Sequence, residues 1–135
     1  MDYFQLQVDD DSINQISTLG LAHLGDGVYE LMVRSWLVLH GKATNKGLHK
    51  ATVHFVAAPA QARSAGVILP KLTAAEQDVF RRGRNSSPHT IPKAASREEY
   101  QTATALEALF GWLWLRGEKA RLNELFEQMM EETSG

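Results

Sequence analysis

The sequence of 135 residues contains no cysteine, which excludes disulfide bonds and zinc sites built from thiolates. It also lacks an apolar run approaching the ~20 residues that span a bilayer, so no membrane partner is expected. No segment alternates apolar and polar residues long enough to predict a β-strand. The N-terminal residues lack the basic segment of a secretory signal, and we therefore expect a cytoplasmic protein.

Helical periodicity dominates the chain instead. Apolar residues recur at three- and four-residue spacing from Leu21 onward, which predicts a helix that ends near Gly41. A short helix is predicted before it, with Ser12 as the N-cap and Gly20 as the end. Residues 1–12 are expected to form a loose N-terminal arm. The next helical stretch, residues 45–68, should be kinked or broken at Pro59.

Capping residues predict where the later helices begin. Two pairs have the capping-box spacing of Ser or Thr followed three residues later by Glu: Thr73 with Glu76, and Ser96 with Glu99. The only long irregular segment, RGRNSSPHTIPKAAS, lies between the two helices they start, and Gly117 separates the last helix from the one before it. We predict a single all-α domain over residues 1–135, with five to seven helices.

Charge is distributed unevenly along the chain, although the net charge is only −2. Residues 42–97 contain ten Lys and Arg against two acids, whereas the segments on either side each carry a net charge of −5. This distribution favours a basic face that binds a polyanion such as a nucleic acid. The alternative is that the charges scatter over the folded surface, and composition does not decide between the two.

Two isolated carboxylates stand out in apolar helices. Asp26 is the only charged residue in 12–29 and lies between two glycines, although a glycine inside a helix costs roughly 1 kcal/mol relative to alanine. Gly25 and Gly27 would permit close packing beside Asp26, or direct approach of a ligand. Glu107 is the only charged residue in 100–115, which is the most apolar stretch of the chain.

An unpaired carboxylate in apolar surroundings is costly, and it normally finds a cation or takes up a proton. Asp26 and Glu107 therefore suggest a shared divalent metal, and Mg²⁺ is the cofactor that best suits carboxylate oxygens and water. Glu30 and Thr104, close to the two acids along their helices, are candidates for outer contacts of this site. The alternative is that each acid pairs with a buried Arg, Lys or hydroxyl.

The residues around the two acids resemble a known family. LGLAHLGDGVYELMVRSWL resembles the signature helix of the ribonuclease III family, and TATALEALFGWLWL resembles its second motif. With the segment RRGRNSSPHTIPK, the chain is most similar to the Mini-III branch, which has the catalytic domain without a double-stranded-RNA-binding domain. The resemblance covers residues from about 19 to 130. It implies a helical catalytic domain that forms a symmetric homodimer.

The resemblance also implies which residues are catalytic. In this family the aspartate of the first motif and the glutamate of the second bind Mg²⁺, and they match Asp26 and Glu107. Other members carry further acids at the positions of Ala22 and Thr104. Mini-III proteins lack these acids, so the departures fit that branch. They leave the number of metal ions at each site open.

The implied activity is cleavage of double-stranded RNA by an endoribonuclease whose two active sites face one valley, leaving 5′-phosphate ends. Mini-III proteins are associated with trimming precursors of 23S ribosomal RNA at a paired stem, where a ribosomal protein could present the substrate. A-form RNA is recognised mainly through phosphates and 2′-hydroxyls, so basic residues should bind it. The candidates are Arg81, Arg82, Arg84, Lys93, Lys46 and Lys50.

Two other functions remain open from the sequence. A non-catalytic RNA-binding or ribosome-associated module could share the ribonuclease III fold, although the presence of both Asp26 and Glu107 argues against it. A helical protein-interaction dimer is the third hypothesis, and it would show no salt-dependent affinity for RNA.

Overall fold

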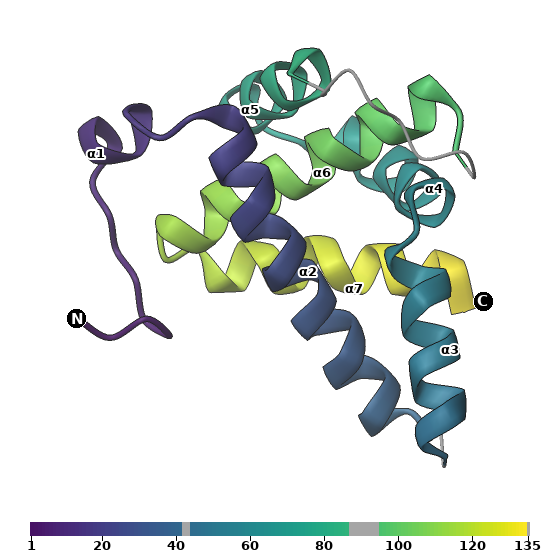
Figure 1. The fold of residues 1–135 in the computed structure, drawn as a ribbon. Coiled ribbons are helices and arrows are strands. Elements are labelled where there is room, and N and C mark those ends of the chain that lie inside the picture. Colours follow the sequence, from purple (N-terminus) through teal and green to yellow (C-terminus); the bar gives the residue numbers. More distant parts are fainter. Residues whose placement is uncertain (42–43, 87–94, 135) are drawn as a thin grey trace.

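The structure is a computed structural model that describes residues 1–41, 44–86 and 95–134. Every regular element in these ranges is helical, which confirms the all-α prediction (Figure 1). The elements are α1 (Asp10–Asn14), α2 (Thr18–Leu39), α3 (Asn45–Val56), α4 (Ala58–Ile68), the 3₁₀ helix η1 (Leu69–Lys71), α5 (Ala74–Asn85), α6 (Arg97–Leu115) and α7 (Lys119–Ser134). None of the helices described is long and apolar enough to cross a membrane.

The local signals for helix starts after α2 are confirmed. Both capping boxes form, with the side chains of Thr73 and Ser96 accepting the N3 backbone N–H and Glu76 and Glu99 reaching back to the caps. Pro59 lies in the first turn of α4, where its missing N–H costs nothing. The predicted interruption is therefore a break between α3 and α4.

The N-terminal helix differs from its prediction. Asp9 rather than Ser12 is the N-cap of α1, since its side chain accepts the Ser12 N–H at 2.8 Å. The chain then turns, and Ser17 caps a separate α2 by accepting the Gly20 N–H. Helix α2 therefore begins at Thr18, and Gly20 lies inside it instead of ending the preceding helix.

The expected loose arm is also corrected in part. Met1, Tyr3 and Phe4 are exposed, but the side chain of Leu6 is buried in a small apolar cluster. The Val8 N–H donates to the carbonyl of Leu115 at 2.8 Å. These residues are far apart in the sequence, so no local pattern predicts this contact. Burial of Leu6 and this hydrogen bond hold the arm against the end of α6.

Helix α6 lies at the centre of the fold and packs against α2, α4, α5 and α7 (Figure 1). Its side chains Leu106, Leu109, Phe110 and Leu113 have no exposed surface. Tyr29 of α2 meets Phe110 edge to face, with ring centroids 5.6 Å apart. Burial of apolar surface against α6 is therefore the main force that fixes the other helices.

The crossing of α2 and α6 explains half of the glycine pattern around Asp26. A Cβ atom on Gly25 would lie 1.6 Å from the backbone oxygen of Glu107, and one on Gly111 would lie 2.0 Å from the backbone oxygen of Leu21. The two helices thus touch through their backbones at this point. Gly27 has no described atom within 4 Å of such a position, so packing among the described residues does not require a glycine there.

Candidate active site

The backbone contact between α2 and α6 brings the two isolated acids together. Asp26 follows Gly25 directly, and Gly25 lies against the backbone of Glu107. The Asp26 side chain is exposed, whereas Glu107 is partly buried beneath it. The pairing of these two carboxylates, predicted from their isolation in the sequence, is therefore present in the fold.

The electrostatics of Glu107 reflect this position. Burial, the negative charge of Asp26 and a hydrogen bond between the two carboxyl groups raise the pKa of Glu107 to about 8, against an opposing contribution from Gln61. The protonated form of Glu107 therefore predominates at neutral pH unless a cation is bound. In the described ranges, no ion pair joins either acid to a Lys, Arg or His. Among the residues that the structure describes, no cationic side chain neutralises the two acids.

Helix α4 supplies two buried polar residues that the sequence analysis missed. Gln61 is 1% exposed, and its Nε2 donates to Oε2 of Glu107 at 3.5 Å. Ser64, one turn later, is also buried. The signal was present in the helical spacing, because Gln61 and Ser64 share a face with the apolar residues Ala65 and Ile68. A polar pair on an otherwise apolar face indicates buried polar contacts.

Tyr29 completes what we call the acid cluster, which comprises Asp26, Tyr29, Gln61, Ser64 and Glu107. Burial raises the pKa of Tyr29 to about 12; the Ser64 hydroxyl opposes the rise, and the charge of Glu107 adds to it. Ser64 lies near the phenol, but the two hydroxyls are not in hydrogen-bond geometry, and the Tyr29 hydroxyl has no partner among the described residues. An unpartnered buried hydroxyl is uncommon in folded proteins.

The two predicted outer residues have other partners. Glu30 accepts a hydrogen bond from Nε of Arg34 at 3.0 Å, one turn further along the exposed face of α2. Thr104 is buried, and its hydroxyl donates to the carbonyl of Tyr100 at 3.0 Å. Within the part of the chain that is described, no third His, Asp or Glu joins the two acids in a metal-binding group. Outer roles for Glu30 and Thr104 remain predictions.

The predicted RNA-binding residues separate into two groups. Arg81, Arg82 and Arg84 are exposed near the end of α5, and the first two both pair with Asp78. Lys46 and Lys50 are exposed on α3, which lies well apart from α5 in Figure 1. Lys93 lies outside the described residues, as does most of the irregular segment around it. The structure thus brings together the three arginines, and it places the two lysines elsewhere.

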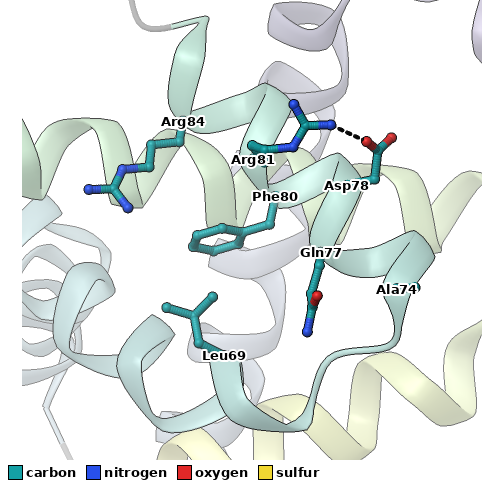
Figure 2. A pocket seen from close by; sticks show the side chains of 7 residues that line it. All are labelled: Leu69, Ala74, Gln77, Asp78, Phe80, Arg81 and Arg84. Atoms are coloured by element: carbon teal, nitrogen blue, oxygen red, sulfur yellow. Dashed lines mark hydrogen bonds and ion pairs between the residues drawn. The ribbon is translucent and has the colours of Figure 1, made fainter.

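A separate surface cavity of about 440 Å³ adjoins these arginines. Figure 2 shows its apolar floor of Leu69 and Phe80, the ion pair of Asp78 with Arg81 on one side, and Arg84 on the other. None of its lining residues belongs to the acid cluster. The cavity therefore adds no group to the candidate site.

Comparison with known proteins agrees with the motifs. The family described as Ribonuclease III domain matches residues 19–118, a range that includes Asp26 and Glu107. The chain belongs to the ribonuclease III family. This membership makes it an endoribonuclease of the ribonuclease III type, which confirms the prediction of an endoribonuclease.

Relatives place the chain beside the Mini-III branch of this family. It is 44% identical over 109 residues to the Mini-ribonuclease 3 of Symbiobacterium thermophilum, covering 81% of this chain and 84% of the relative. It is 41% identical over 125 residues to that of a Thermoanaerobacter species, with 90% and 88% covered. A crystal structure of a Fusobacterium nucleatum protein superimposes with a TM-score of 0.81 at 27% identity, covering 90% of this chain and 98% of that one.

Proposed function

We propose that this chain is a Mg²⁺-dependent endoribonuclease that cleaves double-stranded RNA, with Asp26 and Glu107 as the metal-binding catalytic residues. The observation that carries the proposal is the pairing of two carboxylates across the α2–α6 crossing without a cationic side chain from the described residues to neutralise them. A divalent cation between them would favour the ionised form of Glu107, whose pKa is otherwise raised to about 8.

The donor set fits magnesium. Carboxylate oxygens are hard ligands, and Mg²⁺ is commonly held by one or two carboxylates while it keeps several waters. Such an ion lowers the pKa of a bound water and offsets the charge that develops on a scissile phosphate. Exposed Asp26 would hold the solvent side of the ion, where a phosphate can approach, and partly buried Glu107 would hold the inner side.

The proposed substrate is an RNA duplex, with the stem of a 23S ribosomal RNA precursor as its specific form. Three clustered arginines on α5 support the choice of a polyanion, because contacts from Lys and Arg to phosphates dominate nucleic-acid affinity. Lys46, Lys50 and Lys93 are assigned to the same duplex at other phosphates. A ribosomal protein as the partner that presents this stem remains part of the proposal.

The proposed enzyme is a homodimer. The exposed face of α2 supports this assignment, since Leu19 and Leu31 are 47% and 52% exposed there and Gly27 leaves open space. A second copy related by two-fold symmetry would cover such a face in the self-complementary manner typical of dimers. This surface adjoins Asp26 on α2, so pairing of two copies there would bring their acid clusters toward one substrate.

The decisive test is a cleavage assay on a labelled RNA duplex, with and without Mg²⁺, for the wild type and for Asp26→Asn and Glu107→Gln. We expect both variants to lose cleavage while circular dichroism and the molecular mass in solution stay unchanged. Wild-type cleavage rates in either variant would contradict the site assignment. End mapping of products from a 23S precursor stem then tests the specific substrate.

A further inference from the structure

The carboxamide of Gln61 is placed where an apolar side chain would be expected. Its helix α4 packs against α6, and Ala65 and Ile68 on the same face have no exposed surface. Burying a polar group is costly unless it is hydrogen bonded. The hydrogen bond that the structure gives to this side chain joins it to Glu107, 46 residues further along the chain. The hydrogen bond to Glu107 therefore explains why a polar residue occupies this buried position.

The contact is selective for one oxygen of the carboxylate. Nε2 of Gln61 lies 3.5 Å from Oε2 of Glu107, and the carboxyl group of Asp26 is the other group that hydrogen bonds to Glu107. This distance is at the long end of the range for a hydrogen bond.

We propose that Gln61 is a positioning residue, whose Nε2 holds Oε2 of Glu107 so that the other oxygen is presented to the divalent cation shared with Asp26. The inference rests on the proposed function. Partners of this kind fix the orientation of a metal ligand, and their loss typically costs 10- to 100-fold in metal affinity. The buried Tyr29 hydroxyl lies close enough to Glu107 for the charge of that acid to raise the tyrosine pKa, and buried Ser64 lies near the same hydroxyl.

The test replaces Gln61 by Met, which has a similar length but no N–H donor. Mn²⁺ binding to the full-length protein is measured without RNA, by titration calorimetry or from the electron paramagnetic resonance signal of free Mn²⁺. We expect Gln61→Met to weaken Mn²⁺ binding by about tenfold. Cleavage should fall at low Mn²⁺ concentration and recover at saturating Mn²⁺, which a general loss of structure would not allow.

Gln77→Met provides the matched control. Nε2 of Gln77 also donates one hydrogen bond, to the carbonyl of Leu72 at 3.2 Å, but this contact lies outside the acid cluster. We expect its Mn²⁺ affinity to equal that of the wild type. If Gln61→Met does not fold, Gln61→Asn replaces it, because its carboxamide is one methylene too short to keep the contact and should weaken binding similarly.

Failure of this inference is distinguishable from failure of the proposed function. A folded Gln61 variant with wild-type Mn²⁺ affinity would overturn the positioning role, provided that Asp26→Asn abolishes binding. A wild-type protein that binds no Mn²⁺, or that still cleaves RNA after Asp26→Asn, would instead contradict the metal site itself.

Discussion

Gly25 and Glu107 touch through their backbones, so that the space a Cβ atom would need at Gly25 is filled by the Glu107 carbonyl. Asp26, the next residue, owes its place beside the Glu107 carboxylate to this contact. The glycine therefore serves the site through helix packing, and the helix accepts the propensity cost of roughly 1 kcal/mol.

Gly25→Ala is predicted to separate α2 from α6, because the Cβ atom would meet backbone that cannot move aside as a side chain could. We expect a loss of more than about 2 kcal/mol of unfolding free energy, the range of overpacked cores, together with most of the cleavage activity. Gly66→Ala on α4 is the control, since it meets nothing within 4 Å and improves helix propensity. Thermal unfolding followed by circular dichroism measures both, and a Gly25→Ala protein as stable as the wild type would refute the packing argument.

The ion pair of Glu76 with Arg121 predicts a second stability effect, distant from the acids. Glu76 is buried, and Arg121 donates to both of its carboxylate oxygens, at 2.8 and 2.9 Å. Arg121→Ala would leave this carboxylate buried without its cation, which typically costs about 3–5 kcal/mol. Arg34→Ala breaks an exposed pair with Glu30 and should cost at most about 1 kcal/mol. If denaturant unfolding gave the same loss of unfolding free energy for Arg121→Ala and Arg34→Ala, burial would not be what makes the Glu76–Arg121 pair important.

Stability of the metal-free protein should fall as the pH rises above 5. The folded-state pKa of Glu107 is raised from 4.5 to about 8, so the folded protein binds more protons than the unfolded chain between these values. The contribution of protonated Glu107 to the free energy of unfolding is therefore complete below pH 4.5, and it is lost progressively as the pH rises to about 8. Melting temperatures at pH 5 and pH 8 in the presence of a chelator measure the loss.

Glu107→Gln removes this titration and should flatten the dependence of melting temperature on pH. Glu99→Gln is a suitable comparison, because Glu99 is a half-buried capping residue on the same helix, outside the acid cluster. The variant at Glu99 should lose some stability at every pH and retain the wild-type slope. An unchanged slope in Glu107→Gln would mean that Glu107 is not the group that titrates.

Helix starts were predictable where one local pair of residues determines them. The capping boxes at Thr73 and Ser96 each involve residues three apart, and both form as expected. At the N-terminus, four consecutive residues from Asp9 to Ser12 are all suitable caps, so local sequence does not select one. Docking of Leu6 and Val8 on the end of α6 selects the observed start.

The residues of the candidate site that the sequence predicted are the two charged residues that interrupt long uncharged stretches. Asp26 and Glu107 interrupt long uncharged stretches, and this isolation marks them without knowledge of the fold. Gln61 and Ser64 share a helical face with Ala65 and Ile68, which indicates burial, but the sequence does not say which residue they contact. Their burial follows from how α4 packs on α6, and the partner of Gln61 is Glu107, 46 residues further along the chain.

The arginines of α5 yield the last prediction, which concerns RNA binding. Arg84→Ala should weaken duplex affinity and reduce the slope of log affinity against log salt concentration by about one, as expected for one lost phosphate contact. Lys119→Ala removes an exposed charge at the start of α7 and should leave the slope unchanged.

Fluorescence anisotropy with a labelled duplex over a range of salt concentrations, under conditions without cleavage, measures each slope. A slope for Arg84→Ala equal to that of the wild type would show that this face of α5 does not contact phosphate.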